Sequence, residues 1–187
     1  YEVSASLVGS EMCIRDRELP DFLLTDEKIE SYMYASSDIA VIDDRLAHVI
    51  YFEQKRDINS ALYRGELYID TENNALLRAH FEINPKYIKQ ATGMLVEKKS
   101  RNLKITPQKV IYTVTYKPYN GQYYINHVRG DLFFRIKKRK QLFGTFPLHT
   151  WFEMVTCKID TNRVSRFARS EALPTRTIFA ETRFTYD

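Results

Sequence analysis

Regular alternation of apolar and polar residues is the feature that most restricts how this chain folds. Between residues 75 and 83 every second residue is apolar, while Arg78, His80 and Glu82 occupy positions in between. Residues 110–117 repeat the pattern, with Val and Tyr at alternate positions. A period of two places successive side chains on opposite faces of a β-strand. The pattern therefore predicts antiparallel strands with one apolar face and one polar face.

Several other segments have the residue types of strands, and the composition supports them. The chain contains 13 Tyr and 11 Phe but only 6 Gly and 6 Pro, and 44% of its 187 residues are hydrophobic, which is enough for a core. The formal net charge of +4 is mild and does not indicate nucleic-acid binding, and no apolar run is long enough to span a bilayer. We expect strands at residues 39–42, 48–55, 62–70, 75–83, 110–117, 123–137 and 150–160.

One amphipathic helix interrupts the expected strands, over residues 85–97. Asn84 is a good N-cap and Pro85 a good first helical residue. Such a helix needs a surface to cover, and the sheet is the only candidate. The expected fold is mainly β (α+β), a curved antiparallel sheet with this helix packed on it. The expected buried face of the helix consists of Tyr87, Ile88, Ala91, Met94 and Leu95.

Residues 71–73 predict a three-residue hairpin loop in which Asn73 takes the left-handed conformation. This loop would place Leu67 opposite Leu77 and Glu66 opposite Arg78, so that apolar residues meet and the charges are opposite.

A second hairpin turn is expected at Asn120–Gly121, which is the strongest short hairpin signal. A two-residue loop would place Tyr116 opposite Ile125 but Val114 opposite His127. An odd number of loop residues, or a β-bulge, would restore the pairing of apolar residues. The sequence leaves both solutions open. Shorter signals predict a turn at Asp43–Asp44 and a short helix capped by Thr25.

The chain divides into four parts. Residues 7–17, LVGSEMCIRDR, resemble translated sequencing-adaptor sequence, so we expect residues 1–17 to be a non-native artefact without stable tertiary contacts. We expect residues 18–45 to be a connecting segment, 46–164 the β domain, and 165–187 a truncated C-terminal tail. If Cys13 is foreign, Cys157 stands alone, and a lone cysteine in a strand is usually a buried apolar residue.

No catalytic motif is recognisable, so we expect a protein that is not an enzyme and needs no cofactor or metal. The spacings of zinc peptidases, the serine-hydrolase elbow and a glycine-rich phosphate loop are all missing from the sequence. His80 and Glu82 share a strand face beside Arg78, which suits a metal ion or a proton transfer. A polar sheet face exposed to water explains the same three residues, and we favour that interpretation.

Two sets of residues are candidates for binding. The run Lys137, Lys138, Arg139 and Lys140 is a candidate contact for phosphate or another anion, although a solvated strand end is the default explanation. The apolar strand faces exceed what one short helix covers, which favours a concave face for a ligand or partner. The residues proposed for that face are Tyr63, Leu67, Ile69, Leu77 and Phe81.

Some stretches resemble known envelope proteins. Residues 63–83, YRGELYIDTENNALLRAHFEI, resemble the central hairpin of the outer-membrane lipoprotein-sorting superfamily. Residues 65–187 are similar to the C-terminal half of bacterial envelope proteins named for a carboxypeptidase-regulatory-like domain. The residues that carry this second resemblance include the segments YYINHVRGDLFFR and EMVTCKIDTNRVSRF.

The resemblance implies a periplasmic or outer-membrane-associated location in a Gram-negative bacterium, with a signal peptide and a small β-sandwich upstream. The resemblance to the lipoprotein carriers implies that the curved sheet forms a half-barrel. It implies no peptidase activity. The expected function is a non-catalytic envelope module for binding or assembly, whose partner is an envelope protein. The alternative is a carrier of a hydrophobic or acyl-chain ligand, as in the lipoprotein carriers. The two functions differ in the concave face of the sheet, which would be left open in a carrier and filled by the protein's own helix in an assembly module.

Overall fold

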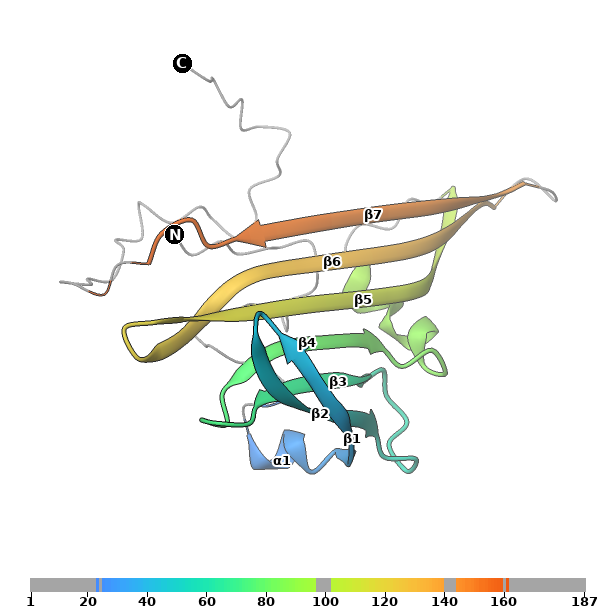
Figure 1. Ribbon diagram of the computed structural model, residues 1–187. Helices are drawn as coiled ribbons and strands as arrows, with labels where there is room; N and C mark the ends of the chain where they lie inside the picture. The colour runs from blue at the N-terminus through green and yellow to red at the C-terminus, as the bar shows by residue number, and fades with distance from the viewer. Residues whose placement is uncertain (1–22, 24, 97–101, 140–143, 160, 162–187) are drawn as a thin grey trace, which may run out of the picture.

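The computed structural model describes residues 23, 25–96, 102–139, 144–159 and 161 of the 187. Seven strands in these residues form one antiparallel sheet in which each strand pairs with the next along the chain (Figure 1). The prediction of an antiparallel, mainly β fold is confirmed. The elements are α1 (Asp26–Ile29), β1 (Tyr32–Ile42), β2 (Arg45–Gln54), β3 (Tyr63–Asp70), β4 (Leu76–Ile83), η2 (Ile88–Ala91), α2 (Thr92–Leu95), β5 (Leu103–Tyr119), β6 (Gln122–Lys138) and β7 (Thr145–Val155).

The sheet is neither closed nor strongly curled, so the expected half-barrel does not form. Strands β1 and β7 are its two edges, and β5 and β6 are its longest strands at 17 residues each. In Figure 1 the hairpin of β1 and β2 crosses in front of the middle of the sheet, whereas β5, β6 and β7 run side by side above it.

Both edge strands differ from their predicted bounds. Strand β1 is 11 residues long, so residues 32–42 of the segment expected to be a connection belong to the sheet. The residues around the bulge between Ser36 and Asp38 are polar, so β1 shows no clear alternation of apolar and polar residues. An exposed edge strand needs no apolar face. Strand β7 begins five residues earlier than expected, since an edge strand tolerates Pro147. Cys157 lies beyond β7 and is exposed, not buried.

The predicted register of the β3–β4 hairpin is wrong. Asn74, not Asn73, has the positive φ of 59°, and Asp70 N donates to Ala75 O at 2.8 Å, which closes a four-residue loop. Leu77 then forms a bulge, so that Leu67 pairs with Ala79. The loop and the bulge together shift the pairing by two residues. Because a shift of two preserves the faces, Leu67 and Phe81 still lie on the apolar side.

The β5–β6 hairpin adopts one of the two predicted solutions. Asn120 and Gly121 both have positive φ, 50° and 77°, as a two-residue type I′ turn requires. Tyr116 pairs with Ile125, and a bulge then brings Val114 opposite Val128. The bulge, not an odd loop, restores the apolar pairing. The turn at Asp43–Asp44 and the Thr25 cap, which accepts a hydrogen bond from Lys28 N, are also confirmed.

The expected helix over residues 85–97 is shorter than predicted. Residues 85–87 form a turn in which Asn84 Oδ1 accepts a hydrogen bond from Lys86 N, so Asn84 caps this turn. One turn each of η2 and α2 follow. Gly93 and the β-branched Thr92 weaken helix propagation here. No helix in the described residues is long and apolar enough to cross a membrane. The predicted buried side chains are nevertheless correct, with Ile88, Ala91 and Leu95 packed in the core.

The main core lies on one face of the sheet and extends from β1 to β6. An aromatic cluster of Tyr63, Phe81 and Tyr112 occupies its centre, with ring centroids 5.3 to 6.5 Å apart. A smaller second cluster joins Ile42, Ala47 and Leu77 at the turn end of β2. Burial of these apolar side chains is the main stabilisation of the sheet.

Replacing Tyr112 with Phe tests the cost of a buried, unpaired hydroxyl group in this core. The Tyr112 hydroxyl is fully buried and has no hydrogen-bond partner in the described structure. An unsatisfied buried hydroxyl costs free energy, so we expect Tyr112→Phe to leave the free energy of unfolding unchanged or to raise it by about 1 kcal/mol in urea titrations. The matched control is Tyr68→Phe, because the Tyr68 hydroxyl donates to Glu66 Oε2 at 2.7 Å and its removal should cost about 1 kcal/mol.

The difference in stability between the wild type and Tyr112→Phe should depend on pH. Burial raises the pKa of Tyr112, so its contribution is fully present below the unfolded pKa of about 10 and is lost as the pH rises toward the folded value. The wild type should therefore lose stability above about pH 10 relative to Tyr112→Phe. If the free energies of unfolding of the two proteins changed equally as the pH rises above 10, the raised pKa of Tyr112 would be contradicted.

Candidate functional site

The five residues proposed as a ligand or partner face do not share one open surface. Leu67 and Phe81 are 4% and 2% exposed in the main core, and Tyr63 and Ile69 pack against it half-buried. Leu77 belongs to the second cluster because of the bulge. These side chains hold the sheet together, and a hydrophobic ligand would have to replace their contacts with one another.

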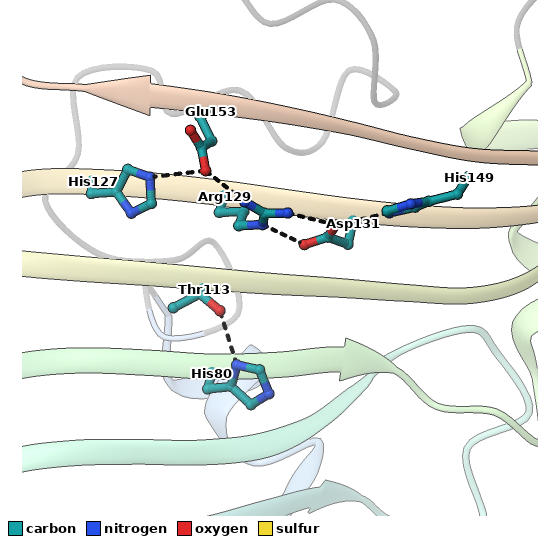
Figure 2. A network of polar contacts seen from close by, with 7 residues as sticks. All are labelled: His80, Thr113, His127, Arg129, Asp131, His149 and Glu153. Atoms are coloured by element: carbon teal, nitrogen blue, oxygen red, sulfur yellow. Dashed lines mark hydrogen bonds and ion pairs between the residues drawn. The ribbon is translucent and has the colours of Figure 1, made fainter.

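The opposite face of the sheet carries a row of ion pairs across β6 and β7 (Figure 2). Arg129 lies at its centre and donates to Asp131 Oδ2 and to Glu153 Oε1, both at 2.7 Å. At the two ends, His149 Nε2 lies 2.8 Å from Asp131 Oδ1, and His127 Nε2 lies 3.8 Å from Glu153 Oε1. Alternate residues of a strand share a face, which is why this row forms.

The electrostatics of this row fit a structural role. The hydrogen bond from Arg129 is the main cause that lowers the pKa of Asp131, and the two carboxylates raise the pKa of Arg129. The His149 ring stacks on Phe133 at 4.3 Å between centroids, and the Arg129 guanidinium lies 5.5 Å from the Trp151 ring. The charged groups therefore pair with one another, and the pairs between the two strands stabilise the packing of β7 against β6.

The three residues weighed as a metal or proton-transfer group each have another partner. Glu82 Oε1 accepts two hydrogen bonds from Arg64, and His80 Nδ1 lies 2.9 Å from Thr113 Oγ1. Arg78 lies over the Tyr68 ring at 5.8 Å. In the described residues no group of three or more His, Cys, Asp or Glu side chains is placed to hold a metal ion. Each of the three side chains therefore contacts the residue paired with it on the neighbouring strand.

A cavity of about 740 Å³ is lined by residues near the start of β5, the end of β6 and the start of β7. These strand ends lie at the right of Figure 1. The described lining of the cavity contains no carboxylate, and none of its cationic side chains forms an ion pair or hydrogen bond with a described residue. We call it the basic cavity. Its cations are Lys89, Lys104, Arg135, Lys137 and Arg139.

The basic cavity contains part of the predicted anionic contact and adds residues that sequence reasoning missed. Lys137 and Arg139 line it, while Lys138 is exposed on the other side of the strand and Lys140 lies outside the described residues. Lys89, Lys104 and Arg135 are brought to it by the pairing of β5 with β6 and by the short helix. Alternation would have found Arg135, two residues before Lys137, but not the other two.

Strand β7, one of the two edges of the sheet, carries several exposed large apolar side chains. Phe146, Leu148, Trp151 and Val155 are between 42% and 58% exposed. Among the described residues β7 pairs only with β6, so the backbone N–H and C=O groups of its other side have no strand beside them. A long edge strand of this kind is a template for pairing with another strand.

Comparison of the chain with protein families, with curated proteins and with solved structures found no match. The resemblance to envelope proteins therefore remains an expectation.

Proposed function

We propose that this chain is a non-catalytic assembly module of the bacterial cell envelope, which joins a protein strand to its sheet at the outer edge of β7. The observation that carries the proposal is an 11-residue edge strand with four large apolar side chains 42–58% exposed. Strand addition at a sheet edge gains affinity from backbone hydrogen bonds and selectivity from alternate side chains. The envelope location comes from the resemblance in sequence.

Strand β7 suits this role better than β1, the other edge. The register of β1 is interrupted by a bulge between Ser36 and Asp38, a feature that protects sheet edges from pairing. The register of β7 with β6 is continuous from Thr145 to Val155. Pro147 removes one backbone donor from β7, and the residues from Leu148 onward keep theirs.

A second copy of β7 is the partner that its sequence fits. An antiparallel pair centred on Thr150 would place Leu148 opposite Phe152 of the other copy and Phe146 opposite Met154. On the other face it would place His149 opposite Trp151. Both faces then continue across the junction, like charges do not meet, and the contact is two-fold symmetric, as most homodimers are.

Sedimentation of the whole chain tests this proposal. We expect a monomer–dimer equilibrium that shifts with protein concentration and is abolished in the double variant Leu148→Lys, Trp151→Lys, because lysine on an edge strand prevents pairing. The matched control is Ile39→Lys, Val41→Lys on β1, where both residues are also exposed, 59% and 66%. A wild type that stays monomeric, or equal loss of the dimer in both double variants, would refute the β7 pairing.

The alternative, a carrier of an acyl chain, has less support. Three of the five residues proposed for its binding face are no more than 4% exposed. Titration with a fluorescent fatty acid measures it directly. Saturable binding that is lost in Leu67→Ala or Phe81→Ala, with the fold retained, would favour the carrier over the assembly module.

A further inference from the structure

We propose that the basic cavity is a binding site for a phosphate-class polyanion, such as a diphosphate or a phosphorylated headgroup. The proposal is independent of the β7 edge. It rests on the five cations defined above, on the absence of ion pairs and hydrogen bonds between their side chains and other described residues, and on the position of two of them in the sheet.

Two lysines that line the basic cavity are paired with one another in the sheet. Lys104 on β5 lies directly opposite Lys137 on β6, and Thr106 lies opposite Arg135 in the same ladder. Side chains directly opposite one another in an antiparallel pair have Cβ atoms only about 5 Å apart, and like charges there are destabilising. No carboxylate among the described lining residues compensates this repulsion. An anion held between the two ammonium groups would do so.

Further hydrogen-bond donors line the basic cavity besides the two lysines. Arg135, Lys137 and Arg139 alternate along and just beyond the end of β6 and so share one side of the strand. Lys89 and Thr92 of the short helix also line the cavity, as do the hydroxyl-bearing residues Thr106 and Thr145 of β5 and β7. Guanidinium and ammonium groups together are the donors that proteins use for phosphate, because a tetrahedral anion accepts hydrogen bonds in several directions.

The size and lining of the basic cavity narrow the ligand class. A volume of about 740 Å³ exceeds what one inorganic phosphate needs and suits a diphosphate or a phosphorylated sugar. No aromatic side chain is among its described lining residues, and single-stranded nucleic acids bind largely by stacking bases on aromatic rings. The site therefore fits a compact polyanion better than a nucleic acid.

Calorimetric titration of the full chain with inorganic pyrophosphate tests the site, and flotation with phosphatidylcholine vesicles, with and without phosphatidylglycerol, identifies the source of the phosphate. We expect saturable pyrophosphate binding that weakens about tenfold or more in Arg135→Gln, Lys137→Gln, because each loses a charge-assisted hydrogen bond. The matched control is Lys55→Gln, Arg56→Gln, which removes the same two charges in an exposed loop away from the cavity.

A second readout separates a ligand site from a merely solvated strand end. Removing one lysine of the opposed pair, in Lys104→Gln, should raise the melting temperature of the unliganded chain while weakening pyrophosphate binding. Vesicle binding that requires phosphatidylglycerol and is displaced by pyrophosphate assigns the site to lipid headgroups, and pyrophosphate binding alone assigns it to a soluble ligand. The proposal is overturned if pyrophosphate does not bind saturably, or if the control variant loses as much pyrophosphate affinity as Arg135→Gln, Lys137→Gln. It is also overturned if single-stranded DNA binds more tightly than pyrophosphate at the same residues.

Discussion

Gly65→Ala is expected to destabilise the protein by about 3 kcal/mol or more, because the backbone leaves no room for a methyl group. A Cβ on Gly65 would lie 2.2 Å from His80 O and 2.5 Å from Phe81 Cα, and both neighbours are backbone atoms that cannot move aside. Gly65 pairs with Phe52 on one side and with Phe81 on the other.

Urea denaturation measures this effect, and Gly93→Ala is its matched control. Gly93 lies in α2, and a Cβ there would meet nothing within 4 Å. Because alanine is the better helix former, the control should be neutral or stabilise by up to about 1 kcal/mol. Equal free energies of unfolding for the two variants would show that β3 and β4 do not approach as closely as the structure has them.

Phe81→Ala is expected to lower the free energy of unfolding by about 3–5 kcal/mol. Phe81 is 2% exposed, and its ring centroid lies 5.3 Å from that of Tyr63 and 5.4 Å from that of Tyr112. Removal of the ring leaves a cavity in the aromatic cluster that the sheet backbone cannot collapse to fill.

Trp151→Ala is the control for Phe81→Ala, measured in the same denaturation series. Trp151 is 57% exposed, and its contact with Arg129 is a surface cation–π interaction worth about 0.5–1 kcal/mol. A larger loss of unfolding free energy in Trp151→Ala than in Phe81→Ala would contradict the assignment of Phe81 to the buried face and of Trp151 to the exposed face.

Side-chain period was sufficient to predict the central strands and their faces. Val110, Tyr112 and Val114 alternate and are all buried, and Ala79 and Phe81 lie on the same apolar side. Alternation is a local property with a direct cause in the pleat of the strand, so it can be read without knowing the partner strand.

Pairing and edges could not be read in the same way. The bulge at Leu77 depends on how β4 fits β3, and Leu76 and Leu77 are equally apolar, so the sequence contains nothing that marks the extra residue. Edge strands β1 and β7 have little to bury and hence a weak pattern. The predicted half-barrel came from resemblance, not from any residue that would fix curvature.

The basic cavity shows the same limit for a candidate site. The run beginning at Lys137 was visible in the sequence, but its opposition to Lys104 depends on the bulge between Pro107 and Lys109, which sets the β5–β6 register at that end. Lys89 joins through the packing of a short helix. Neither long-range relation leaves a signal in a single sequence.

Disulfide formation by a cysteine at Thr150 tests the proposed assembly most directly. Thr150 lies at the centre of the proposed β7 pair, so in Thr150→Cys, with Cys13 and Cys157 changed to Ser, two copies would meet at the distance a disulfide requires. We expect mild oxidation to give a covalent dimer rapidly, and much faster than in the matched variant Ile39→Cys on β1. Equal cross-linking rates in the two variants, or no covalent dimer from Thr150→Cys, would contradict the pairing of two β7 edges.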